Sequence, residues 1–286
     1  MSVGILAAPR RRTDTGAAAI LGATVIALYV PVLRELFALW LQATYYSYGF
    51  LVPVFSGYLV WDALTNDMRR NGDVAVSPLD TGGLVIMAAG LAVLGLGVAA
   101  GSLTLRALSL PVVLMGAAVT TLGPVVARPL AFAIGFLVFM APLPDGVVPA
   151  VSPPLQRFAA AVAEHALRAL GISVVRDDLF LMLPSVTLHV TEACNGLRFL
   201  LAMLVVGVAF AGTTQRRPMR RVVIVAAAVG IAIVANLARV TGTGVMAELW
   251  GAGTAVGLPH IVWGKIVYVA ALVPFVALVV IMRRRA

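Results

Sequence analysis

The chain has 286 residues, of which 61 % are hydrophobic and only 12 % are charged, with a formal net charge of +9. Soluble domains carry roughly twice that charged fraction, so the composition excludes an ordinary globular protein. The basic residues stand in short clusters between apolar runs, which argues against nucleic-acid binding and is typical of a chain oriented in a membrane. A single cysteine excludes an intramolecular disulfide and a site built from several thiolates.

Apolar runs that could span a bilayer recur along the chain and predict an all-α polytopic membrane protein with about eight transmembrane helices. The first run lacks a convincing small-residue cleavage site, so we expect it to be retained. The predicted spans are approximately 17–33, 50–64, 83–100, 105–122, 130–141, 196–211, 222–240 and 261–282. Together they are expected to form one membrane domain over residues 1–286.

Residues 142–195 interrupt this series and are expected to form an extracytoplasmic insert. Ser152, followed by Pro153 and Pro154, indicates the start of a helix, and Gly171 indicates its end. The helix is too polar to span, so we expect an amphipathic helix at the membrane interface. Its apolar face is expected to comprise Leu155, Phe158, Val162, Ala166 and Leu170. The runs 179–183 and 186–191 then predict a short β-hairpin.

Eight spans put both chain termini on one side of the membrane. If that side is cytoplasmic, it receives most of the basic residues, in agreement with the positive-inside rule. The residues that it receives are Arg10, Arg11, Arg12, Arg69, Arg70, Arg128, Arg216, Arg217, Arg220, Arg221, Arg283, Arg284 and Arg285. The start of the sixth span, the end of the seventh and the start of the eighth then lie at the extracytoplasmic face.

The only cysteine, Cys194, stands just before the sixth span. A thiol at a helix N-terminus beside a guanidinium is where a thiolate forms most readily, which makes Cys194 a candidate nucleophile. A lone cysteine in a membrane helix is, however, more often a small hydrophobic residue. Glu192, Asn195 and Arg198 are candidates for orienting groups around the thiol, or they cap and pair at the helix start.

Asn236 and Arg239 at the end of the seventh span and His260 at the start of the eighth are expected to reach the same face. Arg239 could stabilise an oxyanion or bind a carboxylate, or it could extend to the lipid head groups. His260 could take and return the thiol proton, or be an interfacial side chain satisfied by water. His189 is a rival base, and His165 is expected to face water. We expect no metal and no cofactor.

The motifs around these residues resemble those of the exosortase/archaeosortase family of integral-membrane cysteine transpeptidases. Residues 46–53 resemble the family's Y-S-H-G-F-L-V-P segment, and residues 139–144 resemble its mid-chain signature. Residues 192–198 are similar to E-A-C-S-G-[IL]-R, and residues 236–239 with His260 are similar to its later N-x-x-R and histidine. Asn195 stands where serine is commoner in the family, and Tyr48 stands where histidine is commoner.

The resemblance implies that Cys194 is the nucleophile and that Arg239 and His260 complete the site. It also implies a bacterial inner-membrane enzyme with a periplasmic active site. Its partners would be membrane lipid and exported proteins that end in a short Pro-Glu-Pro-like (PEP-CTERM-like) motif, a transmembrane segment and a basic tail. The enzyme would cut near the motif and pass the acyl group to an acceptor through a thioester.

Two other classes of membrane protein remain as alternatives. A non-catalytic scaffold or transporter for polysaccharide or protein export is one, but the spans hold few charged residues that could mark a translocation path. A serine or aspartyl intramembrane protease is the other, but the sequence lacks a suitable buried acid pair or a serine–histidine pairing.

Overall fold

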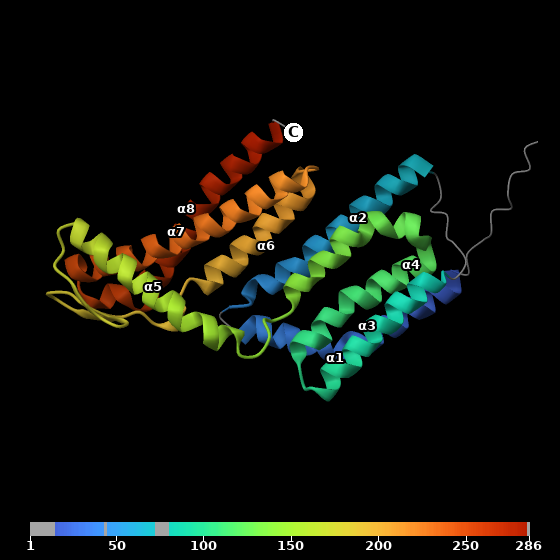
Figure 1. The fold of residues 1–286 in the computed structure, drawn as a ribbon, viewed down its shortest axis with the longest axis horizontal. Coiled ribbons are helices and arrows are strands. Elements are labelled where there is room, and N and C mark those ends of the chain that lie inside the picture. The colour runs from blue at the N-terminus through green and yellow to red at the C-terminus, as the bar shows by residue number, and fades with distance from the viewer. Residues whose placement is uncertain (1–14, 43–44, 72–79, 285–286) are drawn as a thin grey trace, which may run out of the picture. The chain divides into compact units, whose positions relative to one another are not determined.

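The apolar runs form long helices, because in lipid a helix satisfies its own backbone polar groups. The computed structural model describes residues 15–42, 45–71 and 80–284, and the chain divides into two units, Met1–Pro144 and Asp145–Ala286 (Figure 1). Arg10, Arg11, Arg12 and Arg285, which were assigned to the cytoplasmic side, lie outside the described residues.

The described residues of the first unit form four long helices and two short 3₁₀ turns. They are α1 (Thr15–Gln42), η1 (Ser47–Phe50), α2 (Leu51–Asn71), α3 (Thr81–Ala99), α4 (Leu103–Phe136) and η2 (Leu137–Met140). α4 packs against α1, α2 and α3. α1 continues well past its predicted end at residue 33. Glu35, a charged residue within this continuation, accepts two hydrogen bonds of 2.7 Å from Arg106, so its negative charge is paired.

Among the described residues, six helices are long and apolar enough to cross a membrane. They are Ala19–Gln42, Thr81–Ala99, Leu103–Met140, Leu197–Thr214, Pro218–Trp250 and Gly257–Arg284. The predicted count of eight is therefore not confirmed. α2 forms over the predicted span 50–64 but is not among the six, and α4 covers both of the predicted spans 105–122 and 130–141.

α4 consists of two helical segments that meet at Gly123. The backbone there is not helical, with φ at 75° and ψ at 163°, a conformation that glycine adopts without steric cost. Pro124 then occupies the first position of the following segment, where its missing N–H is not needed. Figure 1 shows the ribbon turning back at this point.

Two segments that carry the family resemblance, residues 46–53 and 139–144, meet inside the first unit. The indole of Trp40 donates to the carbonyl of Met140 at 3.3 Å, and the backbone N–H of Leu143 donates to the Tyr46 hydroxyl at 3.3 Å. Burial, with a smaller contribution from Tyr46, raises the pKa of Tyr48 to about 12. Tyr48 therefore stays neutral at physiological pH.

The second unit contains the candidate site. Its elements are α5 (Val147–Ala169), β1 (Val175–Asp177), β2 (Phe180–Met182), β3 (Thr187–His189), η3 (Glu192–Cys194), α6 (Leu197–Thr214), α7 (Pro218–Trp250), η4 (Ala252–Ala255) and α8 (Gly257–Arg284). α7 packs against α5, α6 and α8, and Figure 1 shows α6, α7 and α8 running alongside one another. Phe199, Met203, Ile224 and Phe275 belong to the core of these three helices.

The start and the buried face of α5 differ from the prediction. The helix begins at Val147, so Ser152 is not its N-cap, and Ser152 instead lies buried in a contact with Asn195. Phe158 and Leu170 of the predicted apolar face are 50 % and 63 % exposed. The buried face instead consists of Ser152, Gln156, Ala159, Ala160, Ala163, Glu164 and Leu167. Its alanines let α5 approach α7 closely. The helix ends at Ala169, and Gly171, with φ at 82°, has the left-handed conformation expected of the residue that follows a helix end.

The predicted hairpin is part of a three-stranded antiparallel sheet with the order β1-β2-β3. β2 and β3 pair with Leu181 opposite Leu188, as the hairpin predicts, whereas β1 was missed because its exposed Arg and Asp residues give no alternating pattern. Between β2 and β3, Ser185 donates from its hydroxyl (2.6 Å) and its backbone N–H (3.2 Å) to the Glu248 carboxylate of α7. The sheet is thereby attached to α7 near the end of that helix.

The seventh predicted span, 222–240, is too short. α7 runs from Pro218 to Trp250, and Gly242 and Gly244 lie inside it, where an added Cβ would collide with Trp263 of α8 or Leu167 of α5. These glycines allow close helix contacts and do not end the helix. Asn236 and Arg239 consequently lie inside α7, and Arg239 is about three turns before its end.

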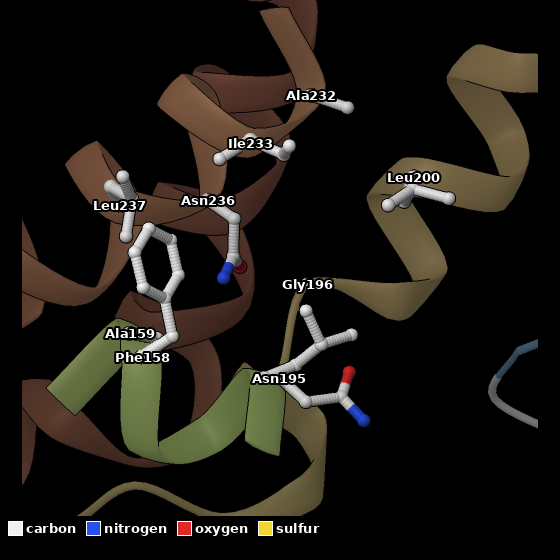
Figure 2. Close-up of a pocket in the computed structure, with 10 residues that line it drawn as sticks. Phe158, Ala159, Asn195, Gly196, Leu200, Ala232, Ile233, Asn236 and Leu237 are labelled. Atoms are coloured by element: carbon white, nitrogen blue, oxygen red, sulfur yellow. The ribbon is translucent and has the colours of Figure 1, made fainter. Parts of the chain in front are cut away.

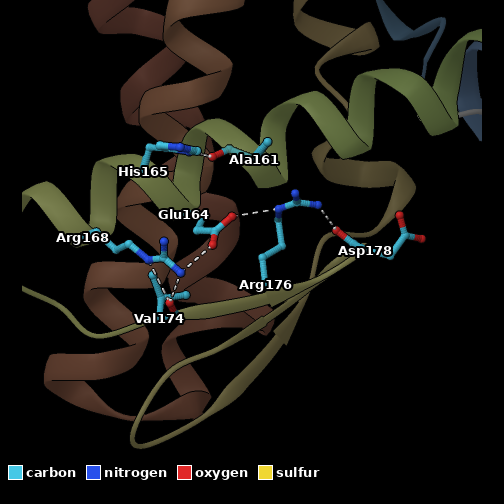
Figure 3. A network of polar contacts seen from close by, with 7 residues as sticks. All are labelled: Ala161, Glu164, His165, Arg168, Val174, Arg176 and Asp178. Atoms are coloured by element: carbon cyan, nitrogen blue, oxygen red, sulfur yellow. Dashed lines mark hydrogen bonds and ion pairs between the residues drawn. The ribbon is translucent and has the colours of Figure 1, made fainter.

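A buried carboxylate joins α5 to the sheet (Figure 3). Glu164 is only 8 % exposed, and its two oxygens accept from Arg176 at 2.9 Å and from Arg168 at 2.7 Å. Arg168 also donates to the carbonyl of Val174. The hydrogen bond from Arg176, helped by nearby positive charge, keeps the pKa of Glu164 below its ordinary 4.5 although burial acts in the opposite direction.

Replacing Glu164 by Gln is expected to lower the melting temperature of the purified protein by a few degrees at neutral pH. Because the folded pKa is lowered, the carboxylate stabilises the fold above pH 4.5 and this contribution is lost as the pH falls further. The difference between the two proteins should therefore shrink below pH 4.5 in thermal unfolding. Asp178→Asn is the control: it breaks the exposed Arg157–Asp178 pair, which contributes little, and an equal loss there would contradict the prediction.

Candidate active site

The chain leaves β3 in a tight turn that holds Cys194. The backbone N–H of Cys194 donates to the carbonyl of Thr191 at 2.8 Å, and Gly196, with φ at +81°, redirects the chain into α6. Asn195 is 3 % exposed, accepts from the N–H of Leu197 at 2.8 Å and donates to the Ser152 hydroxyl at 2.7 Å. Cys194 therefore sits in a fixed turn ahead of α6, not on the helix itself.

A side chain of α7 holds this turn from the other side. The Asn236 amide donates to the carbonyl oxygen of Cys194 at 3.1 Å. Cys194 is half-buried and packs against a core cluster to which α7 contributes Val240. Its sulfur is 4.0 Å from the Thr191 hydroxyl. Asn236 therefore contacts the turn of Cys194 from inside α7, and not from the end of that helix as the sequence predicted.

Arg239 and His260 are in direct contact. The distance from Nη2 of Arg239 to Nε2 of His260 is 2.9 Å. A guanidinium has only donors, so Nε2 accepts and the proton of the neutral ring is on Nδ1. Nδ1 is buried and has no hydrogen-bond partner among the described residues. In this arrangement the lone pair of His260 that could take a proton is already used.

Four neighbours fix the position of Arg239. Its guanidinium carbon lies 5.5 Å from the centre of the Phe199 ring, within the range of a cation–π contact. Trp263 and Thr243 both donate to its carbonyl oxygen at 2.9 Å, and a Cβ on Gly264 would lie 3.1 Å from Nε. Cys194 and Arg198 are electrostatic neighbours of the guanidinium. A guanidinium held in this way inside a long apolar helix is a candidate functional group.

The remaining predicted residues occupy the rim of the site or the insert. Glu192 and Arg198 are exposed. His189 is exposed on the sheet, where its ring stacks on Phe180 with 4.6 Å between ring centres. His165 is exposed, and its Nδ1 donates to the carbonyl of Ala161 at 2.7 Å (Figure 3). Within the described parts of the chain, no group of three or more His, Cys, Asp or Glu side chains could hold a metal ion.

The sequence did not indicate Ser152, Phe199 or Trp263 as neighbours of the site, because each resembles an ordinary cap or core residue. It also gave no sign of a pocket between α5, α6 and α7 that Asn195, Gly196 and Asn236 help to line (Figure 2). Only Asn236, an amide within an apolar run, could have pointed to a polar contact there.

Replacing Gly196 by Ala is expected to reduce activity about 100-fold, since displacing a reacting group by about 1 Å can have that effect. Besides the strain at φ +81°, the added Cβ would lie 2.7 Å from the Asn236 amide and push it away from Cys194. Gly146→Ala is the matched control, because Gly146 has φ at +86° and no atom near the added Cβ. Equal effects of the two substitutions on the rate of the Cys194-dependent reaction would contradict a role for the Asn236 contact.

A family model described as transmembrane exosortase matches residues 40–277, a range that contains every residue of the candidate site. Comparison with curated proteins and with solved structures finds no match.

Proposed function

Because the chain belongs to the transmembrane exosortase family, we propose that it is a cysteine transpeptidase that cleaves C-terminal sorting signals of exported proteins. The observation that carries the proposal is the arrangement on α7. Asn236 contacts the backbone of Cys194, and Arg239, one turn later, contacts His260. One helix thus contacts both the turn that carries Cys194 and the ring of His260, which supports the proposal that the three groups act together.

The proposed reaction begins when the Cys194 sulfur attacks the scissile carbonyl. A C–S bond forms, and the negative charge on the carbonyl oxygen competes with His260 for the N–H groups of Arg239. As Arg239 turns to that oxygen, Nε2 of His260 becomes available and takes the thiol proton. When the C–N bond breaks, His260 returns this proton to the leaving amine and a thioester remains. An acceptor nucleophile or water then attacks the thioester and restores the thiol.

The distribution of charge supports an active site at the periplasmic face of a bacterial inner membrane. Arg220 and Arg221 begin α7, and Arg283 and Arg284 end α8, which the positive-inside rule assigns to the cytoplasm. At about 1.5 Å per residue, Arg239 is about 27 Å along α7 from Arg221, and His260 is about 35 Å along α8 from Arg283. Both distances are close to the hydrocarbon thickness of about 30 Å.

The full topology that we propose has eight spans. The two segments of α4 on either side of Gly123 would each cross the membrane, and α2 would supply the eighth crossing. The substrates would be exported proteins with a PEP-CTERM-like motif, a transmembrane segment and a basic tail. Because such a segment diffuses in the same bilayer, it would deliver the motif to Cys194 without a separate binding step.

The test of the function uses a reporter in which an exported marker protein is followed by a short test segment, an apolar span and a basic tail. Co-expression with the enzyme is expected to release a marker whose new C-terminus, read by mass spectrometry, is either a free carboxylate or joined to an acceptor. Absence of any enzyme-dependent cleavage across a set of test segments would overturn the proposed function.

Cys194 is also expected to react with a membrane-impermeant maleimide added to intact spheroplasts. The chain has one cysteine, so labelling reports this residue alone. The control combines Cys194→Ala with Met219→Cys, because Met219 is 73 % exposed at the other end of the helical bundle and should be labelled only after permeabilisation. Labelling of Cys194 only after permeabilisation would contradict the periplasmic assignment.

A further inference from the structure

A pocket lies beside the turn that carries Cys194 (Figure 2). It holds about 380 Å³ of empty space, part of it open to the surroundings. Its walls are apolar and include Leu155 and Phe158 of α5, Leu200 of α6 and Leu237 of α7. The Phe158 ring, which is half exposed, forms one wall without being part of the buried face of α5. An apolar group that enters the pocket would therefore meet a wall, Phe158, that can move without disturbing the core.

Asn236, which helps to line this pocket, has one polar atom without a partner among the described residues. Asn236 is 5 % exposed, and because the Cys194 carbonyl can only accept, Nδ2 faces that carbonyl and Oδ1 does not. Oδ1 is buried and has no hydrogen-bond donor among the described residues. Figure 2 shows the Asn236 carboxamide extending from α7 between Phe158 and Gly196. Buried carbonyl oxygens are rarely left unsatisfied, so this oxygen is suited to an N–H from a ligand.

We propose that the pocket is a substrate subsite, an inference that rests on the proposed function. It takes one apolar side chain of the polypeptide, and Asn236 Oδ1 accepts a backbone N–H from the same stretch of substrate. An apolar pocket with a single acceptor suits a peptide segment, whereas a charged side chain would lose its hydration there without gaining a partner.

The position of the pocket along α7 identifies which side of the scissile bond it binds. Ala232, Ile233 and Asn236 precede Arg239 in α7 and lie closer to the basic cytoplasmic end of that helix. A substrate whose chain runs from the scissile bond into the membrane would therefore meet the pocket with the residues that follow the bond. The subsite therefore receives the first apolar side chain on the leaving-group side, where the substrate enters the bilayer.

The test varies each position of the reporter's test segment among Ala, Val, Leu, Phe and Trp and measures cleavage in membranes by the wild type and three variants. Phe158→Ala removes a wall, and Leu155→Phe narrows the pocket. Phe180→Ala is the matched control, because Phe180 is a phenylalanine of similar exposure (45 %) on β2 that does not line the pocket.

Phe158→Ala is expected to change the preference at one of the positions that follow the mapped cleavage point. There the rate of cleavage with Trp should rise relative to the rate with Leu by at least about tenfold, the usual scale for a change in an apolar subsite. Leu155→Phe is expected to shift the preference at the same position towards Ala, and Phe180→Ala is expected to leave it as in the wild type. Cleavage with the same preference in all four proteins would overturn the subsite while leaving the proposed function in place. No cleavage of any reporter would overturn both.

Discussion

Replacing Cys194 by Ala is expected to abolish processing of the reporter, with a fall in rate of at least about 1,000-fold. The thiol is the only sulfur nucleophile in the chain, and its loss removes the thioester route entirely. The fold should be unaffected, because Asn236 binds the backbone carbonyl of Cys194, which the substitution retains. The measurement is the amount of cleaved reporter over time, beside the thermal unfolding of each purified protein.

Two comparisons make the result specific. Cys194→Ser keeps the size of the side chain but offers a weaker nucleophile, so it should be nearly as inactive as the alanine variant. Thr191→Val removes only the hydroxyl that lies 4.0 Å from the sulfur and should remain active. Processing by the alanine variant at the wild-type rate would show that Cys194 is not the nucleophile.

Replacing Arg239 by Lys is expected to reduce the rate of cleavage at saturating substrate about 100-fold or more. Lysine keeps the positive charge but presents it as a single ammonium group, whereas the planar guanidinium can hold His260 and turn to an oxyanion with fixed geometry. The loss should fall mainly on kcat, because the charge that develops on the carbonyl oxygen is present only in the transition state.

Arg157→Lys is the matched control for this substitution. Arg157 belongs to the same unit, but it is exposed and pairs with the exposed Asp178, so lysine should serve there equally well. Wild-type kcat in the Arg239→Lys protein would mean that charge alone suffices and that the guanidinium has no directional role.

The order of the elements around the site was predictable from the sequence. Hydropathy located α6 and α8 to within a few residues, and the alternation of helix directions was enough to bring Cys194 and His260 to one end of the bundle. The direct contact between Arg239 and His260, and the one between Asn236 and Cys194, depend on side-chain geometry that no spacing rule contains.

The errors have a common physical cause, since residue type alone does not tell how a residue is used. The seventh span was predicted to end at residue 240, but Gly242 and Gly244 continue α7 and give room to Trp263 and Leu167. Ser152 was interpreted as a cap, but it binds Asn195. Charged residues hid the continuation of α1, because a pairing partner such as Arg106 is far away in the sequence.

The contact between Arg239 and His260 has a consequence for the enzyme when no substrate is bound. While Nε2 accepts from the guanidinium, His260 has no free lone pair with which to act as a base. In the proposed mechanism Arg239 therefore inhibits the resting enzyme as well as stabilising the oxyanion. The base is released only when a carbonyl oxygen draws the guanidinium away, so proton transfer cannot begin before a substrate is in place.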